Sequence, residues 1–399
     1  VGRATAKLAP VLGVGLGRYS DAVEMAERAF EAVGSSGDER VRADLASELA
    51  SAHGLGGSPE LALEWAETGL ALAEKLDATE LLAGAIGARA AALFNLGRHR
   101  EAVILARGQV VLAGAANSLV EQANGLLYVS VFVLDEDPRE ALSAAIESAE
   151  LARRAGHRHL EILNLLNAAE ISILLGEWGD TRVAITELGQ RELPSEQQLF
   201  LRCVEAMLTA LTGDPSRAAA SLEQHAERAT STEFVAARTT YLRARAVVSL
   251  TAGDLEAARR EAAEAVAVDP FGINSPYALS IQARAALWLG DAERAREALS
   301  GMTGFRGRWM VAERLTTEAG LAALEGRVEE AAKSYRDSIE AWRALDCTLD
   351  LALCELDLVL LLGPDHPDAT AAKEARDIFI QLGAIPFLER LNRAADARE

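Results

Sequence analysis

The chain has 399 residues, half of them apolar but only 5% aromatic, and its 40 basic and 60 acidic side chains give a net charge of −20. Such an acidic chain is a poor candidate for direct nucleic-acid binding, which needs a basic face, and its alanine-rich composition favours closely approaching helices over a core of large side chains. No apolar run is long enough to span a bilayer, so we expect no contact with a membrane. The three cysteines, an odd number, argue against a disulfide framework and lead us to expect reduced thiols and a cytoplasmic protein.

A short turn sequence that begins with glycine or aspartate recurs along the whole chain. Consecutive copies lie 36 to 40 residues apart. The ten copies begin at Gly17, Gly57, Gly97, Asp137, Gly176, Gly213, Gly253, Gly290, Gly326 and Gly363. A repeat of this period predicts an array of about ten helical hairpins that occupies residues 1–399 as a single unit.

Small residues occupy two fixed positions around these turns. Seven residues before the turn lie Ala50, Ala90, Ser130, Ala169, Ala206, Ala246, Ala283 and Ala319, and five residues after it lie Ala22, Ala62, Ala102, Ala218, Ala258, Ala295 and Ala331. Two antiparallel helices approach closely only where their crossing point carries small side chains. The turn glycine ends the first helix in a left-handed conformation, and the polar residue after it begins the second.

Between the turns, apolar residues follow the three-and-four spacing of helices, as in residues 81–96 and 160–175. Three units are expected to deviate from the regular pattern. In the first hairpin, residues 1–34, Pro10 takes the small position, and in the fifth unit Thr181 replaces the alanine. In the last unit Leu356 takes the small position, so residues 345–399 are expected to form a capping repeat and C-terminal helices.

The small residue, the turn glycine and the following alanine resemble three signature positions of the tetratricopeptide-repeat (TPR) family. The resemblance covers roughly residues 12–365, although the repeat is longer than the family's unit and most aromatic positions hold alanine or leucine. It implies an all-α, right-handed α-solenoid. It also implies a concave groove that binds a protein, a peptide or a small effector.

The C-terminal segment is the most distinctive part of the sequence; residues 375–390 read ARDIFIQLGAIPFLER. This segment resembles the last helices of the TPR arrays in bacterial STAND-type signalling ATPases, which include large LuxR-type regulators and ATPase-coupled cyclases. In that family the array receives an inducer or partner. Because the chain begins at Val1 without an initiator methionine, we expect it to be a piece or processed product of a longer protein.

The TPR resemblance also indicates which side chains face the groove. Carried over by position, they include Asn124, Glu170, Arg243, Tyr277 and Arg284. We expect the two arginines to form a local positive island beside an aromatic wall, suited to a carboxylate or phosphate. The alternative for each residue is an ordinary solvated helix face.

A second candidate site is the segment Gly301–Trp309, which interrupts the helical pattern with three glycines. If Phe305 and Trp309 are exposed, this segment is a partner-binding loop in which Arg306 and Arg308 also take part. The alternative is a flexible linker whose two aromatic residues pack into the helical stack.

No motif for catalysis, metal binding or a cofactor is present. Cys203, Cys347 and Cys354 include no C-x-x-C pair, the six histidines form no H-E-x-x-H motif, and no strand precedes the glycines at 13, 15 and 17. A glycosidase built as a ring of helical hairpins would need more aromatic residues. We therefore expect no enzyme, no metal and no cofactor. The leading hypothesis is the sensor region of a signalling ATPase, and the alternative is a free-standing scaffold.

Overall fold

The computed structural model describes residues 4–5, 8–9, 11–15, 17–34 and 37–396, and every regular element within them is a helix. The first half contains η1 (Val11–Gly15), α2 (Tyr19–Val33), α3 (Glu39–Leu55), α4 (Pro59–Lys75), α5 (Thr79–Asn95), α6 (His99–Ala115), α7 (Leu119–Phe132), α8 (Pro138–Arg154), α9 (Arg158–Leu174), α10 (Trp178–Gly189) and α11 (Ser195–Leu211). The second half contains α12 (Pro215–Glu223), α13 (Ala226–Ser231), α14 (Val235–Ala252), α15 (Leu255–Val268), α16 (Ser275–Leu289), α17 (Ala292–Met302), α18 (Arg308–Leu324), α19 (Val328–Leu345), α20 (Thr348–Leu362), η2 (Pro367–Ala371), α21 (Ala372–Leu382) and α22 (Ile385–Asp396).

Consecutive helices pair into antiparallel hairpins, and the α14–α15 hairpin shows the local causes. Gly253 ends α14 in the left-handed conformation, with φ of 83°. Asp254 then begins α15, because its carboxylate accepts a hydrogen bond of 3.0 Å from the Ala257 amide. Ala246 and Ala258, one from each small-residue column, are both fully buried. The expected all-α solenoid of TPR-like hairpins is confirmed.

The units expected to deviate keep the same packing by other means. Thr181 is fully buried, and its hydroxyl donates a 3.1 Å hydrogen bond to the Ala169 carbonyl, so the extra polar atom is satisfied inside the hairpin. Leu356 is also fully buried. The sixth hairpin was not expected to deviate, but its second helix is divided into α12 and α13. Pro10 lies outside the described residues.

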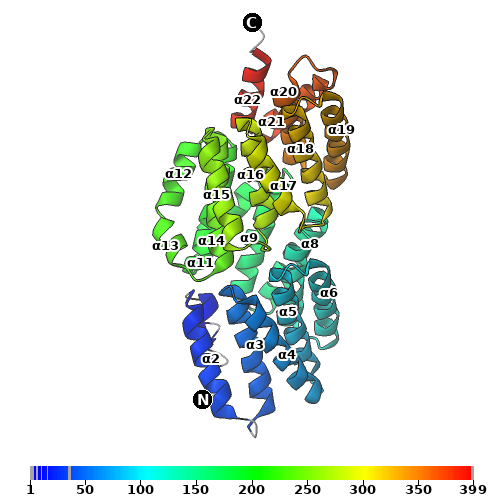
Figure 1. Cartoon of the computed structure of the whole chain (residues 1–399). Helices are drawn as coiled ribbons and strands as arrows, with labels where there is room; N and C mark the ends of the chain where they lie inside the picture. The colour runs from blue at the N-terminus through cyan, green and yellow to red at the C-terminus, as the bar shows by residue number, and fades with distance from the viewer. Residues whose placement is uncertain (1–3, 6–7, 10, 16, 35–36, 397–399) are drawn as a thin grey trace.

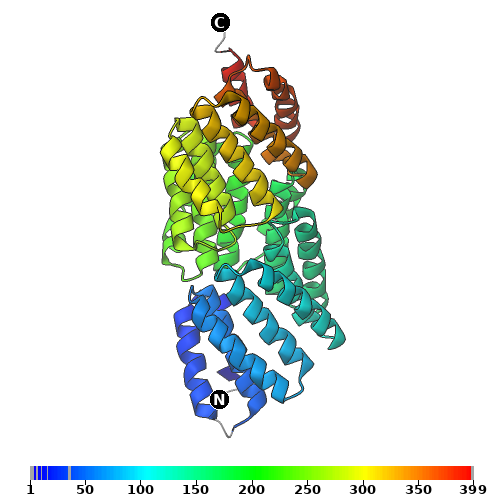
Figure 2. The same ribbon diagram turned by 45° about the vertical axis from the view of Figure 1, so that its right-hand side comes forward.

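The hairpins wind around a common axis into an elongated superhelix, with α2–α6 at one end and the C-terminal helices at the other (Figures 1 and 2). Successive superhelical turns touch each other through hairpin turns. The Ser20 amide donates to Glu233 at 2.7 Å, 213 residues away, and His99 Nε2 donates to the Phe271 carbonyl at 3.3 Å, 172 residues away. The superhelix is therefore tightly wound, and its turns do not stand apart as an open coil.

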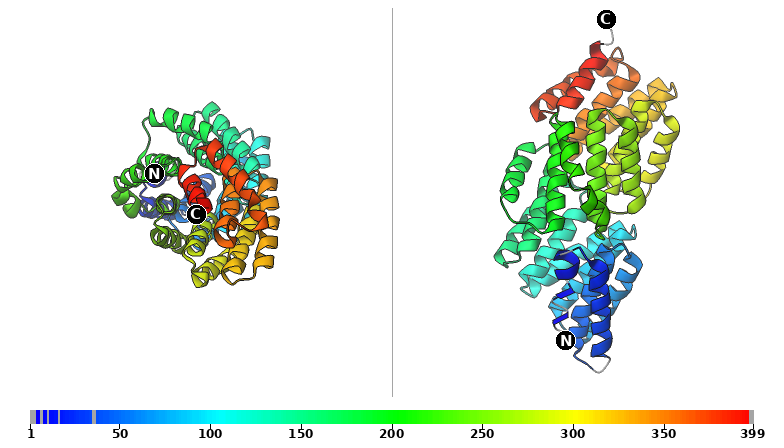
Figure 3. Two further views of the ribbon diagram at one scale, coloured as in Figure 1. Left: turned by 90° about the horizontal axis from the view of Figure 1, so that it is seen from above. Right: turned by 90° about the vertical axis from the view of Figure 1, so that its left-hand side faces the viewer.

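The C-terminal helix α22 lies near the middle of the ring of helices when the molecule is viewed from its end (Figure 3, left). It packs against α20 and α14, and Phe387 and Leu391 on its inner face are buried. This helix therefore covers one end of the superhelix interior. No helix in the described ranges combines the length and the apolar character needed to cross a bilayer.

Candidate functional site

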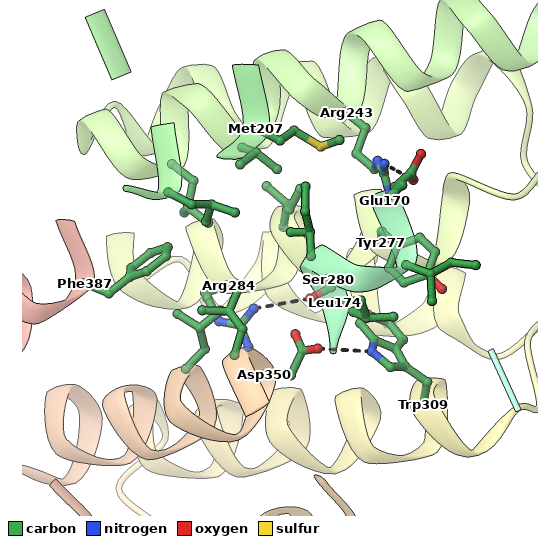
Figure 4. Close-up of a pocket in the computed structure, with 18 of the residues that line it drawn as sticks. Glu170, Leu174, Met207, Arg243, Tyr277, Ser280, Arg284, Trp309, Asp350 and Phe387 are labelled. Atoms are coloured by element: carbon green, nitrogen blue, oxygen red, sulfur yellow. Dashed lines mark hydrogen bonds and ion pairs between the residues drawn. The ribbon is translucent and has the colours of Figure 1, made fainter. Parts of the chain in front are cut away.

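Four of the five groove residues expected from the sequence lie around one interior cavity of about 130 Å³. Glu170 comes from α9, Arg243 from α14, and Tyr277 and Arg284 from α16 (Figure 4). Asn124, on α7, does not line this cavity. The structure therefore brings Arg243, Tyr277 and Arg284 together, although they come from two different hairpins.

The rest of the cavity wall is largely apolar. It consists of Leu134, Ile171, Ile173, Leu174, Met207, Leu211, Val247, Leu250, Ile281, Trp309, Leu349, Leu353 and Phe387, with Ser280 and Asp350 as further polar groups. Phe387 of α22 lies at the end opposite Tyr277 and Trp309 (Figure 4). The cavity is close in size to an engineered apolar cavity of about 150 Å³ that holds benzene. It therefore has room for a single ring or a short aliphatic chain.

At one end of the cavity, Arg243 is buried and forms an ion pair with Glu170. Its guanidinium also lies 5.4 Å from the centre of the Tyr277 ring, within the range of a cation–π contact. The positive charge of Arg243 is therefore already balanced by a carboxylate and an aromatic face. This end of the cavity is polar but carries no excess charge.

The second arginine lies in a dense cluster of buried charges. Arg284 Nε donates to Asp357 Oδ2 at 3.0 Å, and Arg284 Nη2 lies 3.6 Å from Glu313 Oε2. Asp350 is the third buried carboxylate nearby. Burial alone would lower the pKa of Arg284, but Asp357 and Glu313 raise it overall. Burial raises the pKa of Glu313 to about 7 and that of Asp350 to about 6.

These contacts correct the expectation of a positive island. Arg243 faces one carboxylate and Arg284 faces three, so neither arginine is free to hold an anionic partner. Sequence position placed Glu170 in the same groove but could not show which carboxylate pairs with which arginine, because Glu170, Glu313 and Asp357 come from helices far apart along the chain. The hydroxyl of Tyr277, in contrast, has no hydrogen-bond partner among the described residues. Arg243 Nε and Arg284 Nη2 in the same wall are likewise buried without a hydrogen-bond partner in the described part of the chain, but Tyr277, unlike the two arginines, forms no ion pair there.

The segment Gly301–Trp309 differs from the interpretation as an exposed aromatic loop, because Phe305 and Trp309 are both buried. Phe305 stacks on His99 at a centroid distance of 5.4 Å. The Trp309 amide donates to the Asp135 carbonyl at 2.9 Å, and its indole Nε1 donates to Asp350 at 3.2 Å. The segment is thus a contact between two superhelical turns of the same chain.

Arg306 and Arg308 of that segment are exposed. Arg306 lines a second hollow, of about 680 Å³, between the superhelical turns. Leu134 and Tyr277 line both this hollow and the interior cavity. The second hollow leaves no signal in the sequence, because its walls come from segments about 170 residues apart.

Among the described residues, no group of three or more His, Cys, Asp or Glu side chains has the arrangement of a metal site. The three cysteines are buried and unpaired. Burial raises the pKa of Cys354 to about 12 and raises the pKa of Cys203 and Cys347 well above the usual range. A thiol in such surroundings is a weak nucleophile.

Comparison with known proteins adds no family assignment. No family model matches the chain, and no curated protein matches it. Similar solved structures include the crystal structure of yeast Tom70, with 14% identity, a TM-score of 0.35, and coverage of 100% of this chain and 97% of that one. A human IFIT1 dimer with PPP-AAAA has 15% identity, a TM-score of 0.40 and coverage of 94% and 95%. The APC/C hetero-tetramer Cut9-Hcn1 has 12% identity, a TM-score of 0.39 and coverage of 96% and 91%.

Proposed function

We propose that this chain is a non-catalytic binding module that takes a small effector into the interior of its superhelix. The observation that carries the proposal is the cavity beside Tyr277, which combines an apolar wall with a few convergent polar groups. Ligand sites in proteins typically have this composition. Tyr277 belongs to this wall, and its buried hydroxyl has no hydrogen-bond partner among the described residues.

The winding of the superhelix favours a small effector over an extended peptide. The inward-facing residues Arg243 and Arg284 are buried, and α22 covers one end of the interior. A peptide that followed the whole concave face would require the superhelical turns to separate. A ligand of one ring or a short chain fits without that change.

The second candidate function is a scaffold for a protein or peptide partner. Aliphatic side chains on the outer helices support it: Ile104 and Val111 on α6 are 70% and 72% exposed, and Val183 on α10 is 57% exposed. Affinity capture with the outer face altered by Val111→Asp and Val183→Asp, two positions outside both hollows, tests this candidate. Loss of a partner in that variant, with small-molecule binding unchanged, would favour the scaffold.

We further propose that the effector-binding array is the sensor region of a larger signalling or transcription-regulating ATPase, acts in the cytoplasm, and contacts neither nucleic acid nor membrane itself. The proposal rests on the resemblance of residues 375–390 to the last helices of such arrays. The position of α22 over the interior is consistent with a helix that responds to occupancy. The full reading frame tests this context: an ATPase module upstream supports it, and its absence would leave a free-standing array.

The effector site is tested by filling it. Leu174→Trp adds a large side chain to the cavity wall, whereas Leu289→Trp makes the same change at a position that is 40% exposed. A metabolite library is screened by thermal shift against the unaltered chain, and hits are measured by calorimetry. We expect Leu174→Trp to abolish binding while Leu289→Trp retains it. Equal affinity of both variants, each with an unchanged helical spectrum, would place the effector elsewhere.

A further inference from the structure

The hollow between the superhelical turns lies next to the interior cavity, with Leu134 and Tyr277 in the wall that the two share. It is lined by the α5–α6 turn, α6, the α7–α8 turn, the beginning of α16 and residues 304–307. Half-buried Tyr277 therefore stands between an outer hollow of about 680 Å³ and an inner cavity of about 130 Å³. We refer to the outer hollow as the vestibule.

The acidic groups of the vestibule are already engaged. Glu101 forms an ion pair with Arg98 at 2.6 Å. Asp135 accepts hydrogen bonds from the Gly307 amide at 2.9 Å and the Met310 amide at 3.0 Å. Glu136 accepts one from the Arg308 amide at 3.3 Å. These carboxylates are therefore held by donors of the chain itself.

The basic groups are not balanced in the same way. Arg107 is paired with Glu140 at 2.7 Å, but neither Arg100 nor Arg306 forms an ion pair or a side-chain hydrogen bond within the described residues. Both arginines line the same hollow, and each is the sequence neighbour of one of the two stacked rings, His99 and Phe305. The vestibule thus holds two unpaired guanidinium groups in a chain with a net charge of −20.

We propose that the vestibule and the interior cavity together bind a small amphiphilic carboxylate, whose head is held by Arg100 and Arg306 and whose apolar body passes Tyr277 into the cavity. This inference rests on the proposed function and names its ligand class. Guanidinium groups match a carboxylate in shape and charge. The inner cavity accepts a body of about one ring. A singly charged head is favoured over a dianionic phosphate, because every added negative charge meets repulsion from the acidic chain.

The experiment compares acids with neutral analogues of the same shape. Phenylpropionate and octanoate are titrated into the full chain by calorimetry, beside phenylpropanol and octanol. The test variant is Arg100→Ala with Arg306→Ala, and the matched control is Arg153→Ala with Arg154→Ala, two exposed arginines at the end of α8. We expect the acids to bind at least about tenfold more tightly than the alcohols, since hydrogen bonds to charged groups are the stronger ones.

The variants separate this inference from the proposed function. We expect Arg100→Ala with Arg306→Ala to remove the advantage of the acids and leave the weaker binding of the alcohols, while the control keeps the full difference. Leu174→Trp should weaken both classes. Acids and alcohols that bind equally, both sensitive to Leu174→Trp, would overturn the carboxylate head site and keep the effector cavity. No binding by either acid, or acid binding insensitive to the arginine pair, would also overturn the inference.

Discussion

Single methyl groups set the distance between the paired helices. Ala246 and Ala283, seven residues before their turns, are at most 1% exposed, as is Ala258 in the second column. A larger side chain at such a crossing has no free volume to enter, because protein interiors are packed as densely as organic crystals. The alanine content of the chain is therefore a structural requirement at these positions.

Ala246→Leu should lower the free energy of unfolding by about 1–3 kcal/mol, because overpacking forces the two helices apart. Ala263→Leu, on the half-buried side of α15, provides the comparison. Urea unfolding followed by circular dichroism measures both. Similar midpoints for the two variants would show that the crossing is not at Ala246.

The buried arginines act on stability through the carboxylates around them. Arg284→Ala leaves Asp357 and Glu313 without their positive partner, and breaking such a buried pair costs about 3–5 kcal/mol. Arg294→Ala removes only an exposed pair with Glu297 and should leave stability nearly unchanged, because solvent screens such a pair. Thermal unfolding of the two variants decides the point. A melting temperature unchanged in Arg284→Ala would mean that this charge cluster is not buried in solution.

Burial of carboxylates also makes the stability of the folded chain depend on pH. The carboxylate of Glu355 is buried beside Glu374, and burial together with that neighbour raises its pKa from 4.5 to about 9. The folded chain therefore retains a proton that the unfolded chain releases above pH 4.5. The associated stability is full below that pH and is lost as the pH rises through 9, with a slope of at most about 1.4 kcal/mol per pH unit.

Glu355→Gln removes this titration and keeps the side-chain shape. We expect the fall in melting temperature between pH 6 and pH 9 to be smaller in this variant than in the unaltered chain. Glu329→Gln, at an exposed position, should show the full fall. The same pH profile in all three proteins would contradict the raised pKa of Glu355.

At the scale of the helix, the beginning of α18 shows how one superhelical turn completes another. Its N-cap, Gly307, has no side chain to satisfy the first amides of the helix. Asp135 of the α7–α8 turn does so instead, through its carboxylate to Gly307 and Met310 and its carbonyl to Trp309. A β-carbon at Gly307 would lie 2.3 Å from the Asp135 carbonyl oxygen, so glycine is needed for this approach.

Asp135→Ala should therefore expose amides 172 to 175 residues away. We expect faster hydrogen exchange at Gly307 and Met310, a smaller change at Trp309, whose amide bonds the backbone carbonyl that alanine retains, and a loss of about 0.5–2 kcal/mol, the usual range for a helix cap. Asp137→Ala is the matched control, since Asp137 caps its own helix through the amides of Arg139 and Glu140. Exchange at 307–310 that rises equally in both variants would mean that the α18 cap is not supplied by Asp135.

The hairpins could be predicted from the sequence because their causes are local. A turn glycine and two small residues, such as Gly253 with Ala246 and Ala258, lie within 12 residues of each other. The contacts between superhelical turns have no such local signal. The glycines at 304 and 307 do mark an unusual segment, but nothing in the sequence links them to Asp135.

For the candidate site, too, the sequence predicted which side chains face the groove but not the contacts between distant helices. The family's inward-facing positions led to Arg243, Tyr277 and Arg284, which share a cavity. Their partners Glu170, Glu313 and Asp357 depend on how far the superhelix twists per hairpin, which follows from packing between many helices. The free arginines, Arg100 and Arg306, were not identified as a pair for the same reason.

At the scale of the whole molecule, the tight winding converts a concave groove into an interior. Contacts such as Ser20 with Glu233, His99 with Phe271 and Trp309 with Asp135 join consecutive turns along the molecule (Figures 1 and 2). A solenoid of this kind offers an interior cavity with a larger hollow beside it, between the superhelical turns. Its specificity would then depend on the few side chains around Tyr277.

The most direct test of this closed superhelix is a distance measured across two turns in solution. Spin labels on Glu136→Cys and Arg308→Cys report on segments that are adjacent in the structure and 172 residues apart in the chain. The three native cysteines are buried, so labelling is selective. Double electron–electron resonance should give one short, narrow distance distribution. A long and broad distribution would show that the turns stand apart in solution and that the interior effector cavity does not exist.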